Sequence, residues 1–225
     1  MALTVPLTHP LYQERMRPVT TESTKNLAND LSRKSVRYMR MHPVLDLRGS
    51  IPDSIYITNS RYHDSNFLDE YEPYKWAIYT MDKAYVDFEA LYTWTRKDVY
   101  FVTRPKSTMR YEAIEVNYNI NELAGIIGDE IIRLTGYKSS KLYPDNLRLV
   151  KYYDAENDEV ISFITNSFDL GPLEVANIYR NRWQIETFFK WIKGNLTIKA
   201  LWDTLRMQLK PNYGSQSTAI SCLLG

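Results

Sequence analysis

Apolar residues recur along this chain at two periods, one typical of strands and one typical of helices. In the first half, short apolar runs bounded by Gly, Pro or Asp alternate with segments of helical spacing. The elements expected there are two strands over 44–58 joined by a turn at 48–50, a short helix over 66–71, a strand over 75–81, a helix over 86–95 and a strand over 98–103. The pattern therefore predicts a mixed α/β domain.

The pattern changes over 106–168, where short alternating segments predominate and Gly136 and Pro144-Asp145 interrupt them. This stretch is predicted to be rich in β-strands, and it could either complete the main sheet or form an insertion. A long helix should follow it. Asp169 is placed to cap this helix, Pro172 suits its first turn and Gly194 suits its end.

Composition and charge narrow the class of protein only slightly. Hydrophobic residues make up 44% of the 225 residues, enough for a core, and the single cysteine, Cys222, excludes a disulfide framework within the chain. The sequence has no run of about 18 apolar residues and no signal-peptide pattern, so we expect a cytoplasmic protein without a membrane partner. The net charge of +1 neither favours nor excludes nucleic acid, although residues 1–50 have a modest excess of basic side chains.

One face of the last predicted helix combines acidic, basic and aromatic residues. These residues are Tyr179, Arg182, Glu186 and Lys193, with Lys190 beside them. Their spacings of three, four and seven positions put the first four within an arc of about 60° on an α-helix. A carboxylate flanked by cations can meet a metal ion and a phosphate together. The simpler interpretation is a surface helix in which Glu186 and Lys190 form a stabilising ion pair.

A second stripe on this helix is apolar and should face the core. It comprises Ile178, Ile185, Phe189 and Ile192. Glu186 therefore lies at the border of the buried face. Trp183 and Trp191 could stack on bases, but packing in the interior is the simpler expectation for both.

The residues around Glu186 and Asp82 resemble a known family. The string YRNRWQIETFFKWIK over 179–193 fits the Y-(2)-R-(3)-E-(6)-K signature of one branch of DDE-type insertion-sequence transposases. The segment IYTMDKAYVDF resembles the strand of those enzymes that ends in an aspartate, here Asp82, although Ala84 replaces their usual glycine. VLDLRGSIPDSIYIT and the pair His63-Asp64 are also similar, so the resemblance covers roughly 32–200.

The resemblance implies a ribonuclease-H-like core over 32–200, with about 106–168 as a β-rich insertion before the glutamate helix. It also implies phosphoryl transfer on DNA, in which three carboxylates bind two divalent ions, Mg²⁺ or Mn²⁺. The implied partners are the DNA ends of the insertion sequence, target DNA and a second copy of the chain as a homodimer. Such a protein would act on the nucleoid of a bacterium.

The resemblance also implies a role for each matching residue. Asp82 would be the second catalytic and metal-binding carboxylate, and Glu186 the third. Tyr179 would contact DNA beside the metals. The cations Arg182, Lys190 and Lys193 would bind phosphate, which positions the DNA without reading its sequence.

Two features depart from the family pattern. The first carboxylate of the family belongs to an Asp-Ser-Thr-Thr-like strand, and residues 1–31, which show no clear periodicity, contain no such motif. After Lys199-Ala200 the family's continuation fits the neighbouring reading frame, so 201–225 is expected to be an out-of-frame tail. We therefore expect a transposase fragment that is inactive by itself. The alternatives are a non-catalytic DNA-binding or transposase-inhibiting fragment, and another ribonuclease-H-like nuclease.

Overall fold

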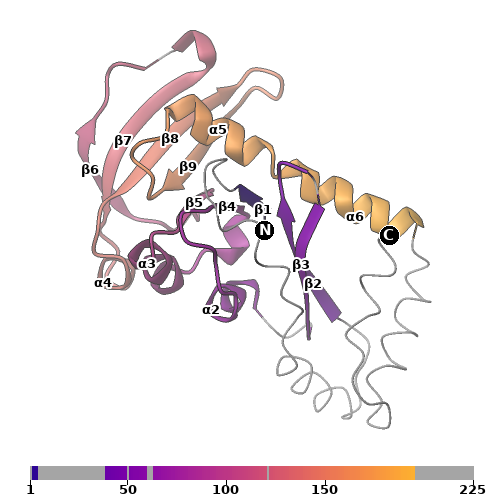
Figure 1. Ribbon diagram of the computed structural model, residues 1–225. Helices are drawn as coiled ribbons and strands as arrows, with labels where there is room; N and C mark the ends of the chain where they lie inside the picture. The colour runs from indigo at the N-terminus through magenta and orange to yellow at the C-terminus, as the bar shows by residue number, and fades with distance from the viewer. Residues whose placement is uncertain (1, 5–38, 50, 60–62, 121, 196–225) are drawn as a thin grey trace.

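The structure is a computed structural model that describes residues 2–4, 39–49, 51–59, 63–120 and 122–195. Its strands form one nine-stranded sheet in the order β3-β2-β1-β4-β5-β9-β8-β7-β6 (Figure 1). The strands are β1 Ala2–Thr4, β2 Met39–Asp46, β3 Ile51–Asn59, β4 Ile78–Met81, β5 Tyr100–Thr103, β6 Tyr111–Val116, β7 Ile126–Leu134, β8 Leu147–Asp154 and β9 Glu159–Thr165. The helices are η2 Asp64–Asn66, α2 Phe67–Glu70, η3 Lys83–Tyr85, α3 Phe88–Arg96, η4 Glu122–Ala124, α4 Ser139–Leu142, α5 Pro172–Arg180 and α6 Trp183–Asn195.

These elements confirm the mixed α/β class, and they are consistent with a ribonuclease-H-like fold. Most of the predicted elements form near their expected positions. They are the strand pair over 44–58, the short helix over 66–71, the helix over 86–95 and the β-rich stretch over 106–168. The tail 201–225 lies outside the described residues, as does most of the segment 1–31. Within that segment, residues 2–4 form β1, between β2 and β4. None of the described helices is long and apolar enough to cross a bilayer.

The parallel strands β4 and β5 lie side by side in the middle of the sheet, and α3 is the crossover between them. Both strands begin later than the sequence suggests. Trp76 and Asp98 have positive φ angles of 66° and 57°, which extended strands do not allow, and the Trp76 N–H donates to the Asp98 carbonyl at 2.8 Å. The apolar residues Ala77 and Val99 are therefore buried just before their strands rather than within them.

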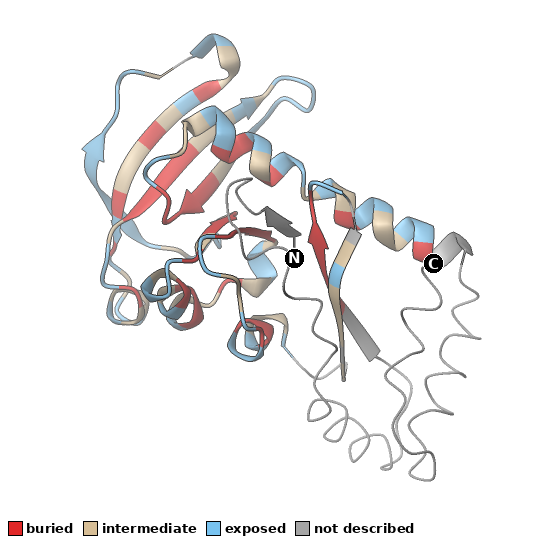
Figure 2. Ribbon diagram, viewed as in Figure 1, coloured by how far each residue is buried: buried red, intermediate tan, exposed pale blue. Residues whose placement is uncertain are grey.

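Helix α3 is fixed at its beginning by a capping residue and along its length by the core. The Asp87 carboxylate accepts hydrogen bonds from the N–H groups of Glu89 and Ala90 at 3.0 and 3.2 Å. Its buried face, which includes Leu91 and Trp94, packs in the main core cluster together with residues of β4 and β5. Figure 2 shows buried residues concentrated in the central strands and on the inner sides of the helices.

The β-rich stretch adds four antiparallel strands to the same sheet through β9, which pairs with β5. A buried ion pair connects this part to the chain before α5. The Arg148 guanidinium binds both carboxylate oxygens of Asp129 at 2.7 and 2.9 Å and also donates to the carbonyl of Leu170. This network fixes the point from which α5 departs.

The single long helix expected after 169 is in fact two helices. α5 and α6 are separated by Asn181 and Arg182, where the bonds Arg182 N–H to Tyr179 carbonyl and Ile185 N–H to Arg182 carbonyl join residues three apart. The expected cap is also different: the Glu174 carboxylate accepts from the Gly171 N–H at 2.7 Å, and Gly171 precedes the helix in place of Asp169. Gly194 lies within α6 rather than at its end.

Candidate functional site

Asp82 follows directly after β4 at the carboxyl end of the two parallel strands, as the sequence predicts. Its side chain is half-buried. One carboxylate oxygen, Oδ1, accepts from the Ala84 N–H at 3.0 Å and so caps η3. Asp87 caps the following helix α3, so two capping aspartates follow β4. The sheet edge thus holds the Asp82 carboxylate in a fixed position, which a metal ligand requires.

Tyr179 is the buried residue of the predicted site. It belongs to α5 and packs against Phe163 of β9, with 4.9 Å between the ring centroids. Burial raises the pKa of the Tyr179 hydroxyl; among its charged neighbours, Arg182 and Arg104 lower it and the Asp82 carboxylate raises it further. The net shift is upward, so the hydroxyl stays neutral and able to donate at physiological pH. The Asp82 carboxylate is therefore close enough to Tyr179 on α5 for its charge to act on the Tyr179 hydroxyl.

Arg182 connects Tyr179 to Glu186 across the break between the two helices. Its guanidinium carbon lies 5.5 Å from the Tyr179 ring centroid, and its Nη2 lies 3.1 Å from the Glu186 carboxylate. The Nε atom is buried and has no hydrogen-bond partner among the described residues. Because the Glu186 side chain is 60% exposed, this ion pair contributes little to stability. The carboxylate remains accessible to a ligand from solvent.

The apolar stripe predicted for the glutamate helix continues across the break between α5 and α6. Ile185 and Ile192 are buried, and Ile185 with Phe189 packs against Leu45 and Leu47 near the end of β2. Ile178 is half-buried and packs in the cluster that contains Tyr179. α6 is therefore held against the end of β2, while the Glu186 side chain is exposed.

Other predicted site residues are less well placed or only partly described. Lys190 is exposed on α6, and Lys193 belongs to the same helix, but its side chain lies outside the described residues. The expectation that Trp183 and Trp191 pack in the interior is wrong, since they are 55% and 46% exposed.

The described residues do not assemble a complete three-carboxylate centre. Within them, no group of three or more His, Cys, Asp or Glu side chains lies close enough to hold a metal ion. Asp46, the acidic residue at the end of β2, is bound through both carboxylate oxygens to Arg48, with Oδ2 2.6 Å from Nη2. The Asp46 charge is thus already compensated by the neighbouring Arg48.

Arg104 is a site residue that sequence reasoning missed. It follows β5 as Asp82 follows β4, and the register Met81↔Thr103 puts the two residues at equivalent positions on the sheet edge. Its guanidinium binds the Glu159 carboxylate at 2.7 Å, and its charge acts on the Tyr179 hydroxyl. The sequence does contain a pattern that could have indicated Arg104, because a charged residue directly follows each of the two apolar strands β4 and β5.

Comparison with known proteins identifies the family. A family model described as the transposase DDE domain matches residues 9–201. The chain belongs to this family. The family match begins upstream of the segment 32–200 on which the resemblance rested, and it ends where the sequence departs from the expected continuation. Members of this family generally use divalent metal ions.

Two curated relatives support the same assignment. The protein y4zB of Sinorhizobium fredii, named as a transposase, is 31% identical over 181 residues, which are 77% of this chain and 50% of that protein. A protein of Geobacillus stearothermophilus, named as a transposase for the insertion sequence element IS5377, is 24% identical over 166 residues, or 74% of this chain and 43% of that protein. The chain thus spans about half the length of the relatives it matches. No solved structure matches it significantly.

Proposed function

We propose that this chain is the catalytic-domain part of an insertion-sequence transposase of the Y-R-E-K branch, which acts on DNA by phosphoryl transfer. The observation that supports this most strongly is the series of contacts from Tyr179 through Arg182 to Glu186, together with the Asp82 carboxylate, whose charge acts on the Tyr179 hydroxyl. It combines two carboxylates with a neutral hydroxyl and a guanidinium, which are complementary to a metal-bound phosphodiester.

Asp82 and Glu186 are the residues we assign to metal binding, because hard oxygen ligands suit Mg²⁺ and Mn²⁺. When bound, such ions activate a water molecule or a 3′-hydroxyl and stabilise the leaving oxygen. Arg182, Lys190 and Lys193 would hold phosphate groups of the DNA by charge. The Tyr179 hydroxyl would donate a hydrogen bond to the same backbone. The substrates are the DNA ends of the insertion sequence and target DNA on the bacterial nucleoid, with a homodimer as the working assembly.

The chain as it stands should bind DNA more readily than it cleaves DNA. Only two assigned carboxylates are available, and the described residues offer no third ligand beside them. This observation favours a second candidate function, a DNA-binding fragment that associates with intact transposase subunits and inhibits them. Both functions use the same DNA-binding surface. They differ only in whether Asp82 and Glu186 bind divalent ions in an arrangement that supports DNA cleavage.

A cleavage assay on duplexes that carry the inverted repeats flanking the gene separates these functions. Mg²⁺-dependent nicking at the repeat ends that disappears in Glu186→Gln, but persists in the exposed α3 control Glu89→Gln, supports the enzyme. Salt-sensitive binding without nicking supports the inhibitory fragment. Equal cleavage of DNA without such repeats would support a different ribonuclease-H-like nuclease. Absence of any binding to DNA would contradict all three.

A further inference from the structure

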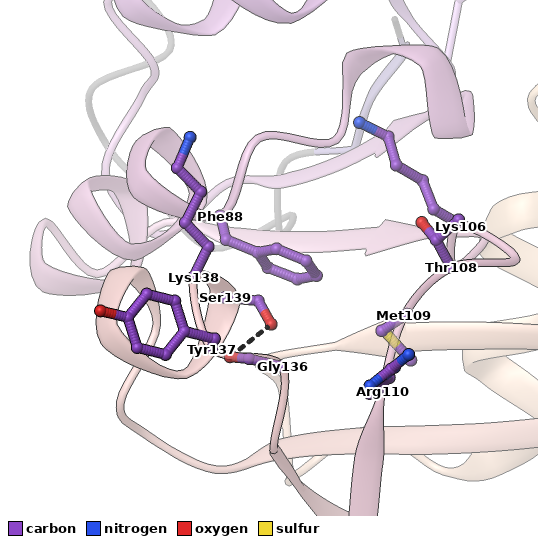
Figure 3. A pocket seen from close by; sticks show the side chains of 9 residues that line it. All are labelled: Phe88, Lys106, Thr108, Met109, Arg110, Gly136, Tyr137, Lys138 and Ser139. Atoms are coloured by element: carbon purple, nitrogen blue, oxygen red, sulfur yellow. Dashed lines mark hydrogen bonds between the residues drawn. The ribbon is translucent and has the colours of Figure 1, made fainter.

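A cationic pocket lies outside the group formed by Asp82, Tyr179, Arg182 and Glu186. It has a volume of about 300 Å³ and is enclosed by the beginning of α3, the loop after β5 and the turn between β7 and α4. Figure 3 shows Lys106, Arg110 and Lys138 around it, with the hydroxyls of Thr108 and Ser139. None of the residues that line the pocket is acidic. Long basic side chains around a concave surface without acidic residues are suited to an anionic group. The Ser139 hydroxyl already donates to the Gly136 carbonyl at 3.3 Å.

One of the three cations is fixed in place by the fold. Lys106 Nζ donates to the carbonyl of Val86 at 2.7 Å, which leaves two of its three N–H groups for a ligand. Arg110 and Lys138 are exposed, and their side chains have no hydrogen-bond or ion-pair partner within the described part of the chain.

The surface beside the pocket is suited to a nucleic-acid strand. The Tyr137 ring is 83% exposed, and Lys141 Nζ lies 4.2 Å from its centroid. Lysine ammonium groups and tyrosine hydroxyls are among the side-chain groups that contact the phosphates of duplex DNA. A small free anion would not need this extended surface.

The pocket is close to the carboxylates along the chain. Lys106 is two residues beyond Arg104, and its partner Val86 is four residues beyond Asp82, so Val86 lies within about 15 Å of Asp82 even in a fully extended chain. The pocket and the Asp82 carboxylate are therefore close enough together to contact one DNA duplex.

We propose that this pocket binds a backbone phosphate of the same DNA duplex on which Asp82 and Glu186 are proposed to act. The inference rests on the proposed function for the location of the DNA, but it concerns different residues. It assigns Lys106, Arg110 and Lys138 to a second phosphate contact that orients the duplex across the sheet edge.

The test compares two double variants of the full 225-residue chain. Arg110→Gln/Lys138→Gln removes two pocket cations, whereas Arg96→Gln/Lys97→Gln removes the same charge from exposed positions near the other end of α3. The affinity of each protein for a duplex of about three helical turns is measured over a range of salt concentrations. Equal thermal unfolding midpoints verify that both variants fold.

The pocket variant should bind several-fold more weakly than the unmodified chain, and the slope of log affinity against log salt should fall by about 0.9, the value for one lost phosphate contact. The control variant should keep the original slope. If both variants change equally, or neither changes, the pocket proposal is overturned while the proposed function stands. If the unmodified chain shows no salt-dependent DNA binding, both are overturned.

Discussion

A single side chain, that of Arg182, connects the site residue on α5 with the one on α6. Arg182 lies at the break between α5 and α6 and contacts Tyr179 on one side and Glu186 on the other. Asn166 has a comparable role inside the protein. Its Oδ1 accepts from the Phe101 N–H, and its Nδ2 donates to the Val99 carbonyl and the Thr95 hydroxyl.

Replacing Asn166 should destabilise the fold strongly. Asn166→Ala leaves the buried Phe101 N–H and Val99 carbonyl without partners, and each unsatisfied group costs about 1–3 kcal/mol. We expect the free energy of unfolding, measured by denaturant titration, to fall by about 2–4 kcal/mol. The exposed control Asn119→Ala should change it by less than about 0.5 kcal/mol. A small effect at Asn166 would mean that water replaces its hydrogen bonds.

Removing the Tyr179 hydroxyl should weaken DNA binding without unfolding the protein. Tyr179→Phe keeps the ring packed against Phe163 and removes only the neutral donor. One lost hydrogen bond of about 1 kcal/mol corresponds to roughly fivefold weaker binding. Fluorescence anisotropy with labelled duplex measures this change, and the exposed Tyr118→Phe serves as control. Unchanged affinity in Tyr179→Phe would remove this residue from the DNA contact.

Among the elements, the βαβ unit β4–α3–β5 agrees best with the sequence, because local patterns specify it. The apolar runs, the strand-end Asp82 and the capping Asp87 are all short-range signals. The expected single helix was wrong because helical periodicity continues through Asn181 and Arg182, and neither residue is a helix breaker. Packing decides this point: α5 packs on β4, β5 and the β-rich strands, whereas α6 packs against Leu45 and Leu47.

The cap of α3 should contribute measurably to stability. Asp87→Ala removes the acceptor for the N–H groups of Glu89 and Ala90 and should lower the free energy of unfolding by about 1 kcal/mol. Thermal unfolding followed by circular dichroism measures the change. Thr93→Ala, an exposed substitution on the same helix, should have a smaller effect. If the two variants lose equal stability, the cap does not hold the helix.

At the scale of the whole molecule, the two parts of the sheet share few backbone hydrogen bonds. β5 and β9 are in register only at Val102↔Thr165 and Thr103↔Ile164. Side-chain contacts must therefore also join the β-rich strands β6–β9 to the strands β1–β5. Helix α5 supplies some of these contacts, because it packs on strands of both groups. The ion pair Asp129–Arg148 also binds the Leu170 carbonyl, just before α5.

Breaking this ion pair should destabilise the whole protein and disturb the site. Arg148→Met leaves the Asp129 carboxylate buried without its partner, which costs about 3–5 kcal/mol. Denaturant unfolding measures the loss. The double variant Arg148→Met/Asp129→Leu should recover much of it, because no uncompensated charge remains. Failure of the double variant to recover stability would point to the lost bond to the Leu170 carbonyl as the main cause.

The same pair predicts a loss of stability in acid. Burial alone would raise the pKa of Asp129, but the hydrogen bonds from Arg148 and Asn117 and the Arg148 charge outweigh it and lower this pKa below 3.8. A carboxyl group with a lowered pKa stabilises the fold above its unfolded pKa, and this contribution is lost as the pH falls towards the folded value. The free energy of unfolding should therefore drop below about pH 4, and less steeply in Asp129→Asn. Parallel pH profiles would contradict this.

The hypothesis of an out-of-frame tail also belongs to this scale. The family match ends at residue 201. The DNA sequence of the gene tests the hypothesis directly. We expect the frame adjacent to codons 201–225 to encode the family's continuation; if no frame does so, the hypothesis is wrong.

The sequence by itself determined the family, the class of the fold, the strand-end position of Asp82 and the outward face that carries Glu186. All of these depend on residue identity and short-range periodicity. Only the tertiary structure decided that the helix is broken at Asn181–Arg182, that Arg104 lies level with Asp82, and that Trp183 and Trp191 are exposed. The physical reason is that strand register and the packing of α5 and α6 depend on contacts between residues far apart in the chain, which no local pattern records.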